Sequence, residues 1–255
     1  QRSGQCYRDL LIFEDRSEIG DGWFHGHSVT DEIALSAASP AHVSVLHDGP
    51  DAVTFRIAVV MNVPTHFDWA RECRSAERGT MELISRVTLR RGADVIDVVT
   101  SLDNQIEDHR LRLLLPSDAT RATTYLAHHP YDLVERSIVL DPDTVTWSET
   151  ELAEKPFLGL QAVGDGSRGL AFLAAGGLHE GGVVDDLRRT MQVTLLRSFR
   201  RTVGTPGEAD GLEKGDLSWS YAIMPFSGAL PRALALARQA SLESGVMTRQ
   251  TGPCA

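Results

Sequence analysis

The chain has 255 residues, 42% of them hydrophobic, and a formal net charge of −10 at pH 7. This length accommodates one large β domain or two small ones, with a core that needs no disulfides. The negative charge disfavours nonspecific binding to nucleic acid or anionic membranes, and no apolar run of about 18 residues predicts a membrane span.

The cysteines and the first residues of the chain give limited information about its chemistry and its extent. Cys6, Cys73 and Cys254 are widely spaced, so they predict neither a disulfide framework nor a metal knuckle. The sequence shows no signal-peptide pattern, which favours a cytoplasmic location. It opens on Gln1 rather than Met, and we expect it to be a fragment of a larger protein.

Short apolar or alternating runs recur between turn residues, and they predict strands. The runs are residues 10–13, 43–46, 53–60, 83–89, 95–99, 111–115, 158–163, 170–173, 191–196 and 218–224. Tight turns are predicted at residues 48–50 and 91–94, where glycine follows a polar residue. Two-residue periodicity with a turn about every 10 to 15 residues is typical of an antiparallel sandwich rather than βαβ units.

Few segments depart from this pattern. Residues 230–240 are rich in Ala and Leu and have Pro231 in the first turn, which predicts a helix. Residues 64–77 predict a short helical or irregular excursion, and residues 125–131 an exposed loop. The composition of residues 205–215 also predicts a loop. A split into two sheet lobes near Asp118 is compatible with the pattern but is not required by it.

Three blocks of sequence resemble a known family. Residues 102–116 read LDNQIEDHRLRLLLP, which is similar to a signature of the C-terminal β domain of family 38 glycoside hydrolases, the α-mannosidases. Downstream, residues 169–180 are similar to that family's GLA…GLPE stretch, and residues 194–198 to its LTLLRS strand. The blocks stand in the family's order, and the resemblance covers roughly residues 9–227.

The resemblance implies an all-β fold, an antiparallel supersandwich of the galactose mutarotase type with one C-terminal helix. Residues 1–255 would form a single domain, with a core at about 9–227 and a helical tail at about 228–245. The chain would then be the C-terminal β domain of a bacterial enzyme.

The resemblance also implies an activity for the larger enzyme. Family 38 enzymes are retaining, zinc-dependent α-mannosidases with an Asp nucleophile and an Asp acid/base, and double displacement needs two carboxylates about 5.5 Å apart. No catalytic or zinc position of the family can be carried onto this chain. We therefore expect zinc and the catalytic residues in a preceding N-terminal catalytic domain. The partners of the chain would be that domain and, through it, an α-mannoside.

Residues 13–25 join a strand to a glycine-rich loop that carries several carboxylates and an indole. Carboxylates bind sugar hydroxyls through paired hydrogen bonds, and a Trp face stacks on a pyranose ring. Asp15, Asp21, Trp23 and His25 are therefore candidate substrate-lining residues. The alternative is an acidic, solvated turn whose Asp and Gly residues serve the backbone.

A second group of polar residues lies inside the resembling block. Asp103, Asn104, His109 and Arg110 are neighbours at the end of one predicted strand and the start of the next. A metal site or nucleophile pair needs groups converging from separate strands. We interpret these four as structural or domain-interface residues, with active-site lining as the alternative.

The histidine pairs His25/His27 and His128/His129 raise a metal hypothesis, because a His-x-His pair on a strand places both rings on one face. No further pair stands at a familiar ligand spacing and HExxH is absent, so we expect no metal site within this chain. The glycines around residues 176–182 are explained by a tight hairpin. Serine-hydrolase and nucleotide-binding motifs are also absent.

Three functions remain open from the sequence. The chain could buttress the catalytic domain of a zinc glycosidase and line its sugar site. It could instead be a carbohydrate-binding β-sandwich, with Trp23, Trp69, Trp147 and Trp219 aligned on one face. The third alternative is a structural module without sugar contact.

Overall fold

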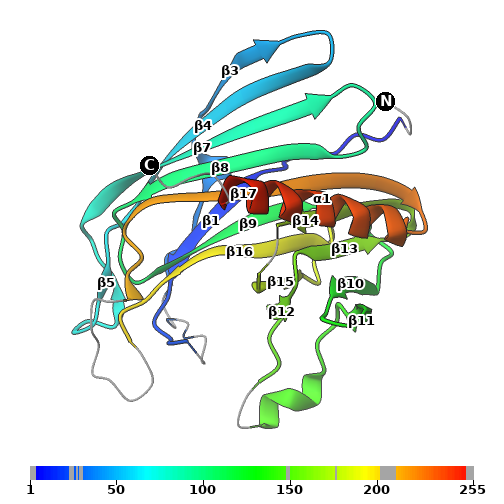
Figure 1. Ribbon diagram of the computed structural model, residues 1–255. Coiled ribbons are helices and arrows are strands. Elements are labelled where there is room, and N and C mark those ends of the chain that lie inside the picture. Colours follow the sequence, from blue (N-terminus) through cyan, green and yellow to red (C-terminus); the bar gives the residue numbers. More distant parts are fainter. Residues whose placement is uncertain are drawn as a thin grey trace.

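The structure is a computed structural model that describes residues 4–22, 26, 28, 31–147, 150–175, 177–201 and 211–250, with side chains up to residue 242. Two antiparallel sheets pack face to face, and one helix lies on the outside of the larger sheet (Figure 1). The predicted all-β sandwich with a C-terminal helix is thus confirmed.

The small sheet has six strands in the order β12-β15-β16-β9-β1-β2. Its strands are β1 (Ile12–Ser17), β2 (Ala34–Leu35), β9 (His109–Pro116), β12 (Lys155–Phe157), β15 (His179–Val183) and β16 (Thr190–Ser198). Central β9 pairs with β1 on one side and with β16 on the other.

The large sheet has nine strands in the order β11-β10-β13-β14-β17-β8-β7-β4-β3. They are β3 (Ala41–Asp48), β4 (Ala52–Pro64), β7 (Arg78–Arg90), β8 (Ile96–Asn104), β10 (Thr124–His128), β11 (Leu133–Ser137), β13 (Leu160–Gly164), β14 (Gly166–Ala174) and β17 (Gly215–Gly228). In each sheet the strands before Asp118 lie on one side and the strands after it on the other, and the two halves meet at the β9–β16 and β8–β17 pairs. Each half therefore contributes strands to both sheets.

The remaining elements are short, apart from the helix. A separate hairpin is formed by β5 (Phe67–Asp68) and β6 (Cys73–Arg74), and two 3₁₀ turns are η1 (Ser36–Ala38) and η2 (Pro142–Thr146). Helix α1 spans Arg232–Gln250. No described helix is both long enough and apolar enough to cross a membrane.

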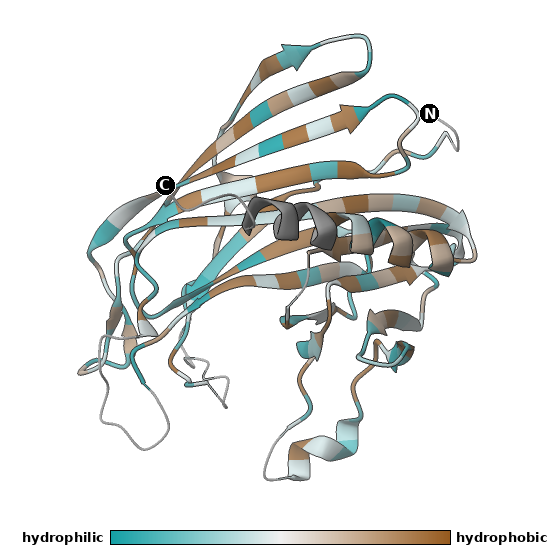
Figure 2. Ribbon diagram, in the orientation of Figure 1, coloured by the Kyte–Doolittle hydropathy of each residue, from teal (hydrophilic) through white to brown (hydrophobic). Residues whose placement is uncertain are grey.

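Alternation along the strands builds the core between the sheets, and Figure 2 shows it as bands of opposite hydropathy. In β9, Leu111, Leu113 and Leu115 are completely buried in the main hydrophobic cluster. Since side chains alternate between faces, Arg110 and Arg112 lie on the outer face of the small sheet. Burying each Leu contributes roughly 1.5–3 kcal/mol.

Helix α1 covers part of the outer face of the large sheet. Its Ala235 packs in a second cluster with Leu160 and Leu173, which lie on β13 and β14. Gln239, one turn further along, donates from Nε2 to the carbonyl of Leu158 at 2.8 Å. This helix begins two residues later than the sequence predicts and continues beyond residue 240.

Two predictions for local structure were wrong in part or in full. Residues 125–128 are not an exposed loop, because β10 occupies Thr124–His128 with Tyr125 and Ala127 buried, whereas residues 129–131 do lie in the connection to β11, with Tyr131 fully exposed. The helical alternative for residues 64–77 is also wrong, since this segment contains the β5–β6 hairpin. Of the predicted loop at 205–215, residues 202–210 lie outside the described residues and β17 begins at Gly215.

The core assignment predicts a contrast between neighbouring residues of β9. Leu113→Ala should lower the free energy of unfolding by about 2–5 kcal/mol, because Leu113 is completely buried between the sheets. Leu114→Ala is the matched control: this half-buried side chain faces the other way and should cost no more than about 1.5 kcal/mol. Denaturant unfolding of both variants measures the difference, and equal losses would contradict the two-sheet core.

Candidate functional site

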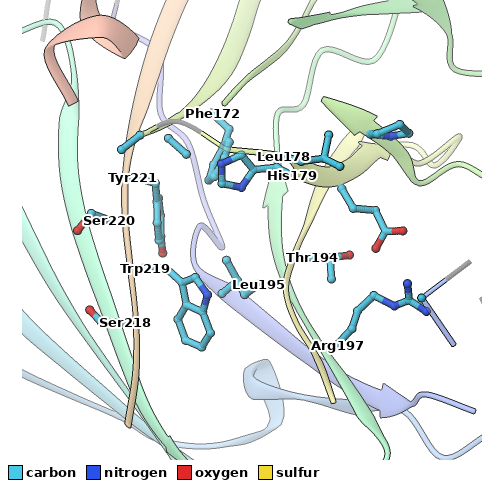
Figure 3. A pocket seen from close by; sticks show the side chains of 15 residues that line it. Phe172, Leu178, His179, Thr194, Leu195, Arg197, Ser218, Trp219, Ser220 and Tyr221 are labelled. Atoms are coloured by element: carbon cyan, nitrogen blue, oxygen red, sulfur yellow. The ribbon is translucent and has the colours of Figure 1, made fainter. Parts of the chain in front are cut away.

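The main pocket of the described residues opens where β16 runs past the end of β15. The last β15–β16 pair is Glu180 with Thr194, and a bulge follows in β16. The opening leads into a pocket of about 810 Å³. Thr194 and Arg197 lie opposite Arg112 and Arg110 of β9, so they border the pocket from the outer face of the small sheet. Figure 3 shows Trp219 and Tyr221 of β17 on one side and Thr194 and Arg197 of β16 on the other.

The apolar wall of this pocket is made of aromatic rings that pack tilted or edge-on against one another. Phe172 lies 5.4 Å from Tyr221 and 6.4 Å from His179, measured between ring centroids. The Tyr221 hydroxyl meets Thr100 Oγ1 at 2.9 Å, and Thr100 meets Ser85 Oγ at 2.9 Å. Burial raises the pKa of Tyr221, so the phenol stays neutral and acts as a structural hydrogen-bonding group.

The polar wall carries groups suited to hydroxyl ligands. His179, Glu180, Thr194 and Arg197 line it. Ser218 and Ser220 of β17 also border the pocket, but they alternate with Trp219 and Tyr221, and their exposed side chains point away from it (Figure 3). The buried Thr194 hydroxyl has no hydrogen-bond partner among the described residues. An unpaired buried hydroxyl costs free energy, and this oxygen is too buried for a ligand in the pocket to reach.

Arg197 joins the pocket to a buried ionic network. Its Nε donates to Glu18 Oε2 at 2.9 Å, and its Nη2 donates to the carbonyl of Asp21 at 2.8 Å. Arg110 donates from Nε to the same Glu18 oxygen at 3.0 Å, and both Arg110 and Glu18 are completely buried. The backbone of Gly20 donates to the other Glu18 oxygen at 3.0 Å. The acidic segment after β1 is thereby tied to β9 and β16.

The environment of Glu18 keeps it ionised. Burial by itself would raise the pKa of this carboxyl, but the charges of Arg110 and Arg197 together with their hydrogen bonds hold the pKa below its ordinary value of 4.5. A carboxylate shared by two guanidinium groups is a fixed charge at neutral pH, and it is not suited to exchanging protons.

Further ion pairs extend across the outer face of the small sheet. Arg112 binds Glu14 and Glu154, and Arg110 lies 3.5 Å from Glu154. These side chains are at least nine-tenths buried, apart from Glu14, which is 11% exposed. Buried ion pairs of this kind fix one geometry more than they add stability, so they hold this face rigid.

The predicted lining residue Asp15 lies inside the protein. It is completely buried, and its Oδ1 is 2.6 Å from His109 Nδ1 while its Oδ2 is 2.6 Å from Arg74 Nη1. The other ring nitrogen of His109 lies 3.1 Å from Asn104 Oδ1. Asp15 therefore joins β1 to β9 within the chain, and contact between Asp15 and a sugar stays a prediction.

Among the other predicted lining residues, only Asp21 belongs to the part of the chain that the structure describes. Asp21 is half-buried and next to Gly22, which lines the pocket. Trp23 and His25 lie outside the described residues. The segment singled out from the sequence thus reaches the pocket edge, although no bound sugar tests its role.

The four residues interpreted as structural or interface groups occupy different environments. Asn104, His109 and Arg110 are completely buried, whereas Asp103 is exposed and accepts a hydrogen bond from Gln105 at 2.7 Å. Asn104 donates to the carbonyls of Ile106 and Glu213 and thereby closes the turn after β8. The sequence analysis identified these four residues as candidates, but it did not predict which of them are buried and which one is exposed.

No three His, Cys, Asp or Glu residues within the described part of the chain are arranged to hold a metal ion. His128 Nδ1 contacts the carbonyl of Leu158 at 2.6 Å, and His129 accepts from Arg136 at 2.5 Å. His25 and His27 lie outside the described residues. The residues that the structure does describe therefore do not fit a zinc site.

The tryptophans do not form one row. Trp69 packs edge-on against Phe67 and carries Arg201 at 4.1 Å over its ring, whereas Trp147 follows η2 and is 62% exposed. Trp219 lines the pocket. Trp23 is outside the described residues. The three described indoles come from three separate elements, which weakens the case for a binding face made of aligned aromatic rings.

Sequence reasoning missed the pocket residues Thr194, Arg197 and Trp219 as a group. They lie on two strands that belong to different sheets, and their proximity depends on how those sheets stack. The local signal was the family resemblance of residues 194–198, which predicted a strand without its orientation.

This combination of fold and pocket defines a class of protein, a two-sheet β-sandwich with a polar and aromatic pocket bordered by both sheets. No family model matches the chain. Solved structures do match it: an α-mannosidase from Enterococcus faecalis V583 superposes with a TM-score of 0.83 at 21% identity, over 94% of this chain and 28% of that chain. A second structure, a protein of glycosyl hydrolase family 38 from Enterococcus faecalis, gives a TM-score of 0.81 at 21% identity, over 94% of this chain and 29% of that one.

A curated relative adds sequence similarity. A putative mannosylglycerate hydrolase from Halalkalibacterium halodurans is 30% identical over 210 residues, which is 77% of this chain and 22% of that protein. The predicted resemblance to the C-terminal β domain of family 38 glycoside hydrolases is confirmed, and the chain is a mannosidase-like β-sandwich domain. It spans under a third of the length of each of these relatives.

The ionic network predicts a pH-dependent loss of stability. Glu18→Gln removes the closer counter-charge of the buried Arg110, whose other carboxylate partner, Glu154, lies at 3.5 Å, and should lower the free energy of unfolding by about 3–5 kcal/mol at pH 7. The folded-state pKa of Glu18 is lowered, so its contribution is present above pH 4.5 and is lost as pH falls through the folded-state value. The gap between wild type and variant should therefore narrow below pH 4.5.

Denaturant unfolding at several pH values measures this gap. Glu82→Gln is the control, because Glu82 forms an exposed pair with Arg56 at 3.5 Å and should cost at most about 1 kcal/mol. A Glu18→Gln variant as stable as Glu82→Gln at pH 7 would contradict the role given to the network.

Proposed function

We propose that this chain is the C-terminal β domain of a retaining, zinc-dependent α-mannosidase-like glycoside hydrolase. In this proposal it supports the catalytic domain and lines part of the sugar site. The observation that carries the proposal is the 30% identity, over 77% of the chain, to a putative mannosylglycerate hydrolase. The fold shared with an α-mannosidase is consistent with it.

In this proposal the catalytic groups and the supporting groups belong to different domains of the enzyme. Zinc and the two catalytic carboxylates would come from an N-terminal catalytic domain, since no residue of this chain matches those positions. The α-mannoside would be the substrate of the whole enzyme. The relatives from Halalkalibacterium halodurans and Enterococcus faecalis support a bacterial source, and we infer a cytoplasmic location.

Two features support a role at the sugar site. The acidic segment after β1 reaches the pocket edge at Gly22, where Arg197 holds the carbonyl of Asp21. The pocket offers a carboxylate, an imidazole and a guanidinium beside an indole, which is a combination suited to binding polyols. Because Glu18 is fixed by two arginines, this segment is positioned before substrate arrives, which lowers the cost of ordering it.

A carbohydrate-binding module without a catalytic partner is the second candidate. The pocket itself favours this candidate, because Trp219 lines it together with the polar residues His179, Glu180 and Arg197. Calorimetric titration of the chain with mannose and methyl α-mannoside distinguishes the two: a module that functions alone binds free sugar, whereas a supporting domain binds it only together with the catalytic domain.

The chain by itself is expected to hydrolyse no α-mannoside. Retaining hydrolysis needs a nucleophile and an acid/base about 5.5 Å apart, and no such pair of the family can be assigned to this chain. The assay is release of the aryl group from an aryl α-mannoside with zinc or cobalt added. Turnover that disappears on mutating a residue of this chain would refute the supporting role.

In the intact enzyme, Asp21→Ala and Trp23→Ala should each lower kcat/KM while leaving the melting temperature unchanged. Losing one buried hydrogen-bonded group at a ligand costs about 1–3 kcal/mol, which corresponds to roughly a 5- to 150-fold decrease. Asp51→Ala is the control, since this carboxylate is 89% exposed in the turn between β3 and β4. Wild-type kinetics in both variants would mean that the segment is only a solvated turn.

A further inference from the structure

The edge strand β3 differs from the other edges of the two sheets. In the small sheet the edges are β2 and β12, with two and three residues, and the other edge of the large sheet is β11, with five. Strand β3 has eight residues, and all eight are exposed. Figure 1 shows it as the outermost strand, on the side away from β11.

Edge strands in monomeric proteins are usually protected against pairing by short length, by Lys or Pro, or by inward-pointing charges. Strand β3 reads AHVSVLHD and contains neither Lys nor Pro. Val43, Val45 and Leu46 are 62%, 57% and 52% exposed. Its protective devices are a bulge between Val45 and His47 and a single charged residue, Asp48, at its end.

The residues of β3 divide cleanly between the two faces of the sheet. Val43 pairs with Ile57, which packs against the main core, so Val43 and Val45 lie on the inner face. His42 and Ser44 lie on the outer face. The bulge resets this alternation: His47 pairs with Thr54 and lies on the outer face, while Asp48 pairs with Val53 on the inner one.

We propose that β3 pairs antiparallel with β3 of a second copy of this chain, about a two-fold axis through Ser44. This register places Ser44 opposite Ser44 of the second copy and Val43 opposite Val45. Allowing for the bulge, it also places His42 opposite His47 and Ala41 opposite Asp48. Every pair then joins residues of the same face, which is what a continuous sheet requires.

Charge is compatible with this pairing. Asp48 is the only Asp, Glu, Lys or Arg in the strand, and the register sets it opposite Ala41, so the two copies bring no like carboxylates together. Four valines meet on the inner face around the axis. Outward-pointing backbone N–H and C=O groups of β3 gain partners, as in β-augmentation. The proposal is independent of the proposed enzymatic activity.

Sedimentation velocity of the 255-residue chain tests the pairing at about 100 μM, a concentration that nearly saturates a contact of micromolar Kd. The expected species has the mass of two chains of 27.9 kDa each. Ser44→Lys sets two ammonium groups opposite each other and should shift the protein to monomer. Ser137→Lys, on edge strand β11, is the matched control and should leave the dimer intact.

Disulfide cross-linking tests the proposed register of the two β3 strands. Directly opposite residues of antiparallel strands have Cβ atoms about 4.5–5.5 Å apart, so Ser44→Cys should form an intermolecular disulfide on oxidation. The background carries Cys6→Ser, Cys73→Ser and Cys254→Ser. His42→Cys alone should not cross-link, whereas His42→Cys with His47→Cys should. A monomeric wild type, or a dimer that survives Ser44→Lys and fails to cross-link through Ser44→Cys, would overturn the proposal.

Discussion

The carboxylate of Glu18, held between the guanidinium groups of Arg110 and Arg197, is the interaction on which the functional part of this fold depends. It joins the segment after β1 to β9 and β16, and both Glu18 and Arg110 are excluded from water. Attraction in a buried environment offsets the desolvation of these charges only while all partners are present. The network therefore specifies one arrangement of three strands and one loop.

A second hydrogen bond of Arg197 connects this network to the pocket. Arg197 also binds the carbonyl of Asp21, so the network that orders the small sheet places the acidic segment at the edge of the pocket. Across that pocket, the tilted ring pair of Phe172 and Tyr221 belongs to the large sheet. The pocket thus has one wall from each sheet, and its shape depends on how the two sheets pack.

Much of this architecture can be predicted from the sequence, because alternation reports which face of a strand is buried. The Leu111, Leu113 and Leu115 pattern predicts β9, and the resemblance of residues 102–116 predicts the class of domain. Strand β10 was missed, since His128 and His129 follow Tyr125 in a polar context that resembles a loop. The site was harder to predict, because the burial of Asp15 against Arg74 and His109 joins residues distant in sequence. No local pattern records such contacts.

The central claim is that this domain supplies an ordered wall of the sugar site in a larger glycosidase. The most direct test is a crystal structure of the intact enzyme with a mannose-shaped inhibitor bound. The account predicts that zinc and both catalytic carboxylates come from residues outside this chain, and that Asp21 or its neighbours lie within hydrogen-bonding distance of the inhibitor. An inhibitor bound with no contact to residues 18–25 or to the pocket bordered by both sheets would contradict it.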